Sequence, residues 1–140
     1  MPADFFIDSQ LGVVFSKGTG VFSEAVALDH MTRLLGHPDF NLEFKQLLDF
    51  RDVTSMELTN QEVRELAGRS VFSARSQRAF VVSTDLQFGL SRMFGTLREF
   101  RGEHGIMIFR EMSEAISWLG LAAEPDPELF ALLKPPPGDA

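Results

Sequence analysis

Residues 44–71, with the sequence FKQLLDFRDVTSMELTNQEVRELAGRSV, constrain the fold more than any other stretch of the chain. They begin with an apolar run of strand length, from Phe44 to Phe50, which predicts a largely buried strand. Thr59 then stands three residues before Glu62, a spacing typical of the capping box at the start of a helix. A buried strand that leads into a capped helix is half of a βαβ unit, so we expect parallel strands joined by helices.

The rest of the chain alternates strand and helix patterns in the same way. Residues 4–8 and 11–17 predict an antiparallel hairpin, and Gly18, Thr19 and Gly20 are expected to end its second strand. We therefore predict a single α/β domain with a five-stranded, mostly parallel sheet, an N-terminal antiparallel hairpin and about four helices. The later strands are expected at residues 78–83 and 106–109, and the helices after Ser23, at Thr59, after Thr84 or Asp85, and after Ser113.

Composition places the chain among ordinary globular domains. Its 140 residues are 44% hydrophobic and 24% charged, and no apolar run approaches the roughly 20 residues of a membrane span. The first residues lack the basic and apolar regions of a secretory signal, and the chain has no cysteine, so we expect a cytoplasmic protein. Residues 1–121 are predicted to form the domain, and residues 122–140 an acidic, proline-rich tail.

The net charge of −7 is unevenly distributed. Residues 60–111 hold 8 basic and 6 acidic side chains, whereas the segments on either side are acidic. The basic residues of this middle segment are all arginines interleaved with acids, which is typical of a solvated helix face. This balance argues against nucleic-acid binding, which needs a coherent positive surface.

The histidines and glycines do not have the spacing of a catalytic or metal site. His30 is expected on the polar side of its helix, His37 at a helix end and His104 in a turn. None of them stands beside a nucleophile or at a metal-ligand spacing from another ligand. The glycines that follow Lys17 lack the spacing of a phosphate-binding loop. We therefore predict no enzyme activity, no metal and no cofactor.

The third predicted helix has an aromatic residue outside its core-facing arc. Phe88 lies about 160° from Leu90 around this helix, and the neighbouring Gly89 lowers its helix propensity. Phe72 is likewise expected on the side of its own helix that faces away from the core. Together with Arg92, these residues could line an apolar ligand pocket, form a homodimer interface, or simply lie at helix ends. The arc expected to face the core consists of Leu86, Leu90, Met93, Leu97 and Phe100.

Asp49, Arg51 and Asp52 come at the end of the central predicted strand. Open α/β sheets bind their ligands at the carboxyl edge of the strands. The trio could therefore hold a polar ligand or a partner's charge, or it could form a local ion pair at the rim of the sheet.

The opening hairpin and four further segments carry a resemblance to a known fold. These segments are 47–53 (LLDFRDV), 78–83 (RAFVVS), 88–94 (FGLSRMF) and 106–119 (IMIFREMSEAISWL). As a set, and in the order of the predicted elements, they resemble the STAS domains of bacterial anti-sigma-factor antagonists and the uncharacterised STAS-like proteins related to them. The resemblance covers most of residues 4–120 and implies a non-catalytic regulatory module that binds a protein partner.

In the antagonists, a serine at the start of the helix after this strand is phosphorylated by a partner kinase, which releases a bound partner. The corresponding stretch here, residues 57–60 (ELTN), departs from the family's pattern of an aspartate, two serines and a glycine. Thr59 keeps a hydroxyl at a helix N-terminus and Ser55 lies in the loop predicted before it, so both are candidate switch sites. Alternatively, Thr59 only caps the helix. STAS folds are also similar to lipid-carrier domains, so the alternative function is binding of a small apolar ligand or lipid.

Overall fold

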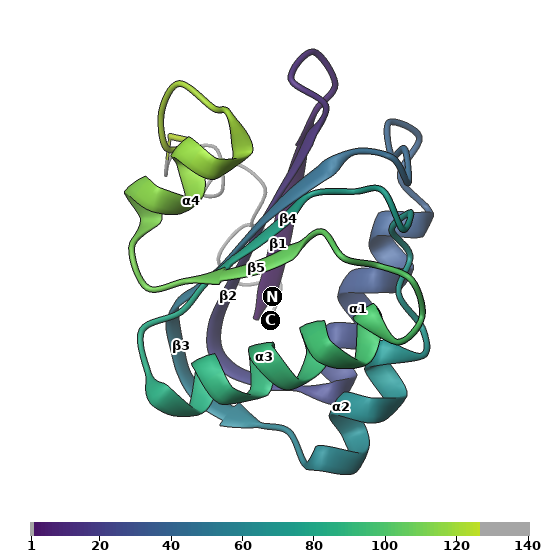
Figure 1. The fold of residues 1–140 in the computed structure, drawn as a ribbon, viewed down its shortest axis with the longest axis vertical. Coiled ribbons are helices and arrows are strands. Elements are labelled where there is room, and N and C mark those ends of the chain that lie inside the picture. Colours follow the sequence, from purple (N-terminus) through teal and green to yellow (C-terminus); the bar gives the residue numbers. More distant parts are fainter. Residues whose placement is uncertain (1, 127–140) are drawn as a thin grey trace, which may run out of the picture.

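The computed structural model describes residues 2–126, which form one five-stranded sheet and four helices (Figure 1). The strand order along the sheet follows the chain, β1-β2-β3-β4-β5, with β1 antiparallel to β2 and all later pairs parallel. The predicted α/β domain with an opening hairpin is thus confirmed, while residues 127–140 of the predicted tail lie outside the described part. The elements are β1 (Ala3–Asp8), β2 (Val13–Ser23), α1 (Glu24–Leu35), β3 (Lys45–Glu57), α2 (Asn60–Ala67), β4 (Arg78–Val81), α3 (Asp85–Glu99), β5 (Ile106–Phe109) and α4 (Met112–Leu119).

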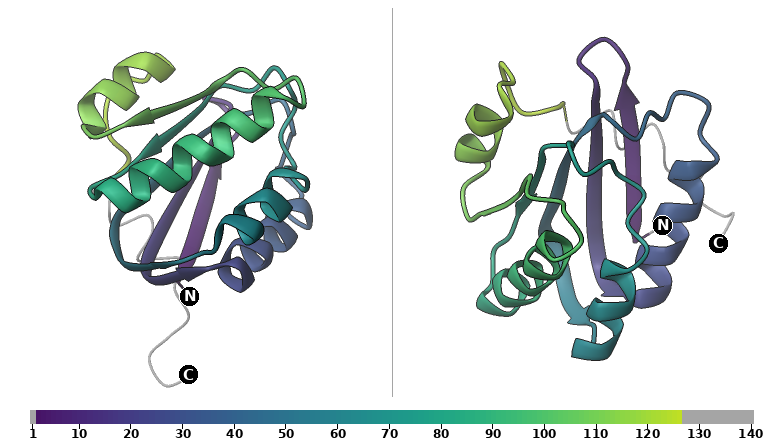
Figure 2. Two further views of the ribbon diagram at one scale, coloured as in Figure 1. Left: turned by 60° about the horizontal axis from the view of Figure 1, so that its bottom comes forward. Right: turned by 45° about the vertical axis from the view of Figure 1, so that its right-hand side comes forward.

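The uniform strand order decides where the helices lie. Each parallel connection advances by one strand in the same direction, and right-handed connections that advance the same way place their helices on the same face of the sheet. The helices α1, α2 and α3 therefore share one face, and α4, which follows the last strand, packs on the other (Figures 1 and 2). On this face α1 packs on β1 and β2, α3 packs on β3 and β5, and α2 lies against both helices.

Side chains alternate between two cores along each strand. On the α4 face, Phe15, Leu47 and Val81 pack against Ala115 and Leu119, and all of these residues are buried. The opposite face is built around the buried side chains Ala3, Phe22, Ala27, Phe50, Val53, Leu66, Phe80 and Val82.

The predicted caps account for the starts of three helices. Ser23 and Thr84 each accept a hydrogen bond from the backbone N–H three residues later, as expected of N-caps. At α2 the Thr59 hydroxyl accepts from the Glu62 N–H at 3.1 Å, and the Glu62 carboxylate accepts from the Thr59 N–H at 2.9 Å. The helix α4 begins at Met112, and its N-cap is Glu111, two residues before the predicted Ser113 cap; Glu111 makes no side-chain cap bond.

Two strands are longer than the sequence pattern predicts. The strand β2 continues through Gly18 to Gly20 with two register shifts, because the glycines permit a bulge rather than ending the strand. A Cβ atom at Gly18 would lie 2.8 Å from Val53, so this residue allows β2 and β3 to approach closely. The strand β3 runs to Glu57, which places Ser55 within a strand and not in a loop.

Two helices differ from their predicted faces. The helix α2 ends at Ala67, so Phe72 lies in the following loop. In α3 the buried positions include Gln87, whose side-chain amide donates to the Val53 carbonyl, and Leu86 is 58% exposed. Phe100, also predicted to face the core, is 85% exposed. The prediction was wrong because polar and small residues occupy the inner face of α3, which a hydrophobic pattern cannot reveal.

Candidate functional site

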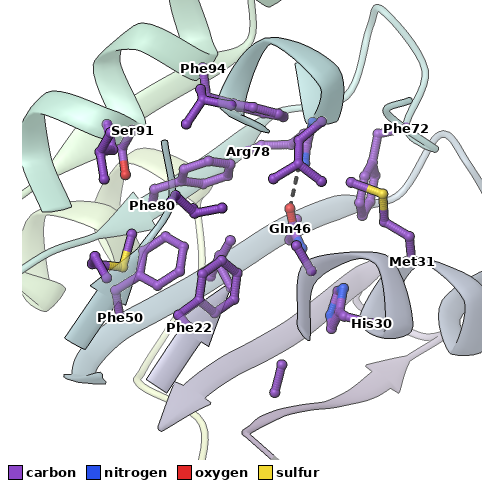
Figure 3. Close-up of a pocket in the computed structure, with 18 of the residues that line it drawn as sticks. Phe22, His30, Met31, Gln46, Phe50, Phe72, Arg78, Phe80, Ser91 and Phe94 are labelled. Atoms are coloured by element: carbon purple, nitrogen blue, oxygen red, sulfur yellow. Dashed lines mark hydrogen bonds between the residues drawn. The ribbon is translucent and has the colours of Figure 1, made fainter. Parts of the chain in front are cut away.

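A partly open cavity of about 90 Å³ lies between the sheet and the helices α1 to α3 (Figure 3). We call it the helix-side cavity. Inward-facing side chains of β1 to β4 form its floor, and the three helices form its walls. The lining side chains are mostly apolar: Ala3, Phe22, Ala27, His30, Met31, Leu34, Gln46, Leu48, Phe50, Met56, Leu58, Val63, Leu66, Phe72, Arg78, Phe80, Leu90, Ser91 and Phe94.

A chain of buried polar side chains crosses the floor from β2 to β4. The Ser16 hydroxyl hydrogen-bonds the His30 Nε2 atom at 2.9 Å and accepts from the Gln46 side-chain amide at 3.2 Å. Gln46 in turn accepts from the Arg78 Nε–H at 3.0 Å, the bond drawn in Figure 3. Gln46 and Arg78 are register partners on adjacent parallel strands, so the sheet itself holds them together.

His30 is buried under α1 and does not lie on the polar side of its helix. Burial, followed by the positive charges of Arg33 and Arg78, lowers the pKa of His30 from 6.5 to about 4. The imidazole is therefore neutral at pH 7. The sequence pattern predicted the wrong side because the partner that satisfies this side chain, Ser16, comes from a different strand.

Arg78 belongs to a buried group of two arginines and one glutamate, which we call the charged cluster. Its Nη1 atom donates to the Glu103 carboxylate at 3.0 Å and to the Ser70 hydroxyl at 3.1 Å. The Arg98 Nε atom donates to the same Glu103 oxygen at 3.3 Å, and its Nη1 atom donates to the Ala67 carbonyl. Glu103 is 0% exposed and Arg78 5% exposed. Two guanidinium groups thus share one carboxylate.

Burial lowers the pKa of Arg78 to about 10, against the opposing effect of Glu103, so the side chain stays charged at neutral pH. Its Nη2 atom makes no hydrogen bond to any described residue. Aromatic rings surround the guanidinium carbon, at 4.5 Å for Phe72, 5.4 Å for Phe80 and 5.6 Å for Phe94 (Figure 3). Such rings attract a cation but offer no acceptor in the plane of the guanidinium.

Two further polar groups at this site lack a partner within residues 2–126. The second oxygen of Glu103, Oε2, is buried without a hydrogen bond. Ser91 on α3 is 4% exposed and lines the cavity, and its hydroxyl makes no hydrogen bond to a described residue. Of these groups only the Glu103 Oε2 atom is both buried and without a partner among the described residues, and Glu103 does not line the cavity.

The structure separates the residues that the sequence suggested for a ligand or partner surface. Phe72 lines the cavity, where its ring packs edge-on against Phe40 at 5.5 Å. Phe88 is half-buried under the Arg110 guanidinium, 4.7 Å from the centre of its ring, and lies outside the cavity lining. Gly89 and Arg92 are exposed and also lie outside it.

Asp49, Arg51 and Asp52 lie in the middle of β3 and form ion pairs on the α4 side. Arg51 donates two hydrogen bonds to Asp49, at 2.9 and 3.0 Å, and one to Glu124 at 2.7 Å. The bonds to Asp49 raise the pKa of Arg51 above its ordinary value. Lys17 pairs with Asp52 at 2.8 Å. Because the strand order never reverses, the sheet also lacks the switch point at which open α/β sheets bind ligands.

The two candidate switch residues lie outside the cavity. Thr59 is exposed, and its hydroxyl is occupied by the capping box; Ser55 is half-buried within β3. Two acids of α2, Glu62 and Glu65, lie near Glu24. The hydrogen bond with Glu65 and the nearby charge of Glu62 raise the pKa of Glu24. A phosphate on Thr59 would add negative charge to this surface.

Sequence reasoning missed the polar residues of the cavity floor. Ser16, Gln46 and Arg78 each stand within or at the start of an apolar strand run, in VVFSK, KQLLDF and RAFVV. A polar residue in such a run is a usable signal, but the runs alone cannot show that Gln46 and Arg78 line the same cavity or that Ser16 is hydrogen-bonded to Gln46. Within residues 2–126 no three or more His, Cys, Asp and Glu side chains could hold a metal ion. None of the helices in that range has the length and apolar character to cross a membrane.

No protein-family model and no curated protein sequence matches the chain. Among solved structures, it is similar to an uncharacterised protein of the DUF3478 family from Shewanella loihica, which is described as having a SpoIIAA-like fold. The two share 17% sequence identity, the match covers 84% of this chain and 93% of the other, and the TM-score is 0.55. At this identity the likeness concerns the fold alone. The chain therefore has a SpoIIAA-like, STAS-like fold, as the sequence resemblance predicted.

Proposed function

We propose that this protein binds a small, largely apolar molecule in the helix-side cavity, without catalysing a reaction on it. The observation that carries the proposal is the cavity itself, which lies under three helices and is lined mainly by aliphatic and aromatic side chains. Apolar concave sites with a few polar groups are the usual form of small-molecule sites in proteins. Of the two functions that the sequence left open, this geometry favours the small apolar ligand.

The polar groups of the cavity support a binding site more than a catalytic one. His30 is neutral, and its Nε2 atom is already hydrogen-bonded to Ser16. A catalytic base needs a nucleophile or a substrate proton within reach, and Ser16 itself also bonds Gln46. These groups hold one another in place across the strands.

The proposal is tested by adding 1-octanol to the purified protein and recording ¹H–¹⁵N spectra. We expect saturable shifts at backbone amides of residues that line the cavity, and smaller shifts on α4. The variant Ser91→Leu fills the cavity from α3 and should abolish the shifts. Thr96→Leu, at an exposed position of the same helix, should leave them unchanged. Shifts that persist in Ser91→Leu would reject the proposal, and so would the absence of saturable shifts in the natural protein with both 1-octanol and its charged counterpart, octanoate.

Self-association is a second candidate function, for the surface at the start of α3. Leu86 is 58% exposed in the first turn of α3, and Phe88, two residues further along, is half-buried. A second copy of the chain would cover the apolar side chains of this turn. Phe88→Asp should then change the elution volume in gel filtration, whereas Arg92→Asp, at an exposed position one turn further along, should not. An unchanged elution volume for Phe88→Asp would exclude self-association through this surface.

Binding of a protein partner that is released by phosphorylation of Thr59 or Ser55 remains a hypothesis from the STAS resemblance. The exposure of Thr59 favours it over Ser55, which is half-buried. Thr59→Asp should weaken capture of any partner that the natural protein retains, and Thr59→Ser should not. Equal capture by both variants, with the fold preserved, would exclude the switch at Thr59.

A further inference from the structure

We propose that the molecule bound in the helix-side cavity carries a carboxylate that pairs with Arg78, so that the site selects apolar monocarboxylates over neutral apolar molecules. The inference rests on the proposed function and specifies its ligand. Three observations carry it: the charge of the cluster, the Arg78 Nη2 atom that makes no hydrogen bond to a described residue, and the place of Arg78 in the cavity lining.

The charged cluster holds one more positive charge than negative. Arg78 and Arg98 are both bonded to Glu103, and no other described acid forms an ion pair with either arginine. The side chains of Arg78, Arg98 and Glu103 are 6%, 11% and 0% exposed, so water screens this charge weakly. Buried charges in proteins are normally paired, because an unpaired charge of low exposure is costly. One bound monoanion would neutralise the cluster.

Arg78 also presents a donor that is free to bind the anion. Its Nε and Nη1 atoms are fully engaged with Gln46, Ser70 and Glu103, whereas Nη2 makes no hydrogen bond to a described residue. Arg78 lines the cavity, and the rings of Phe72 and Phe94 hold its guanidinium in place. A charge-assisted hydrogen bond from a fixed donor in a place of low exposure is among the stronger polar contacts.

The charge of the cluster and the number of free donors favour a carboxylate over a phosphate. A phosphate monoester carries about 1.5 to 2 negative charges at neutral pH and three strong acceptor oxygens. The cluster has one excess positive charge and Arg78 has one free nitrogen, which match a single carboxylate. The apolar lining of the cavity then accommodates a hydrocarbon or aromatic body, with the Ser91 hydroxyl available for one further polar atom.

The experiment compares octanoate with 1-octanol, which have the same chain length but differ in charge. Dissociation constants are measured on the full chain at pH 7 by titration calorimetry or by the same ¹H–¹⁵N spectra. We expect octanoate to bind at least about tenfold more tightly than octanol, because of the charge-assisted bond to Arg78. The Arg78→Met variant should bring the two constants within about twofold of each other, by losing affinity for octanoate only.

Two further variants keep the test decisive if Arg78→Met does not fold. Arg98→Met removes the excess charge at a residue that does not line the cavity, and it should reduce the preference for octanoate while octanol binding is kept. Arg92→Met removes an exposed arginine from the same helix and should leave the preference unchanged. Arg92→Met also tests whether that residue holds the anionic group.

The outcomes separate this inference from the function on which it rests. Equal binding of octanoate and octanol to the natural protein would overturn the inference and leave the apolar site intact. A preference for octanoate that survives in both Arg78→Met and Arg98→Met would also overturn it. Saturable binding of neither probe would overturn the inference and the proposed function together.

Discussion

The two faces of the sheet are made from the same strands but differ in how they are filled. On the α4 face, Phe15, Leu47 and Val81 meet a single helix in an apolar cluster, with the ion pairs of Arg51 at its edge. On the opposite face, Gln46 and Arg78 occupy central strand positions under three helices, next to a cavity of about 90 Å³. One face of the sheet is therefore closely packed, and the other leaves the cavity in which we propose that a ligand binds.

This difference follows from the number and length of the covering helices. One short amphipathic helix can lie flat on a sheet and exclude water along its whole length. Three helices of 12, 8 and 15 residues meet the sheet at separate places, and the space between them must be filled by long side chains or by a ligand. Part of this space is filled by Phe50, Arg78 and Phe80, and the rest is the helix-side cavity.

Among these variants, Glu103→Gln should lower the free energy of unfolding the most, because it removes the negative charge that pairs with two buried arginines. Leaving a buried charge without its partner costs about 3–5 kcal/mol of unfolding free energy. Urea unfolding measures this loss. Arg98→Met should cost less, since Arg78 and Glu103 still pair in that variant. The exposed Glu99→Gln, four residues away, should change stability by less than about 0.5 kcal/mol. If Glu103→Gln lowers the free energy of unfolding no more than Glu99→Gln does, the charged cluster does not stabilise the fold.

Protonation of His30 should lower the stability of the folded protein in acid. Its pKa is about 4 in the folded protein and near 6.5 when unfolded, so the unfolded chain binds more protons between these pH values. The stability contributed by neutral His30 is complete above pH 6.5, declines as the pH falls and is lost by about pH 4. The loss amounts to roughly 3 kcal/mol.

The variant His30→Gln isolates this contribution from that of the carboxylates, which titrate in the same range. Unfolding free energies of both proteins are measured at several pH values between 4 and 7. The difference between them should change with pH as the natural protein loses stability. A constant difference would show that His30 does not titrate as its burial requires.

Leu47 and Leu48 offer a direct comparison of the two faces, because they are adjacent in β3 and point in opposite directions. Leu47 is 1% exposed in the α4 core, so Leu47→Ala should cost about 3 kcal/mol through lost burial and a new cavity. Leu48 lines an existing cavity and is half-buried, so Leu48→Ala should cost only about 1 kcal/mol. Chemical denaturation of the two variants measures the difference. Equal losses would mean that the two faces are equally well packed.

The smallest effect is expected at the start of α2, which forms one wall of the cavity. Thr59→Ala removes half of the capping box and should cost about 1 kcal/mol, whereas Thr59→Ser keeps the acceptor oxygen and should cost less. Thermal unfolding of the two variants distinguishes them. If both behave like the natural protein, the hydroxyl does not contribute to the stability of α2.

The sequence was sufficient for the order of the elements because that order depends on local signals. Thr59 with Glu62 marked α2, and the apolar run at residues 44–50 marked β3. The site could not be predicted in the same way. Arg78 and Glu103 are 25 residues apart, and Ser16 is 30 residues from Gln46, so their contacts depend on strand register and on helix placement. The prediction for His30, based on one face of one helix, failed because its partner Ser16 comes from another element.

The sequential strand order has a consequence for how the molecule is made. Because neighbouring strands in the sheet are also neighbours in the chain, β1 to β3 and α1 can associate on a ribosome before the later half has been synthesised. Arg78, Arg98 and Glu103 are added only afterwards, onto a surface that already exists. We therefore expect the amides of β4, α3 and β5 to gain protection from hydrogen exchange last during refolding. A ligand that stabilises these elements would act on the final step of folding and would leave the earlier steps unchanged.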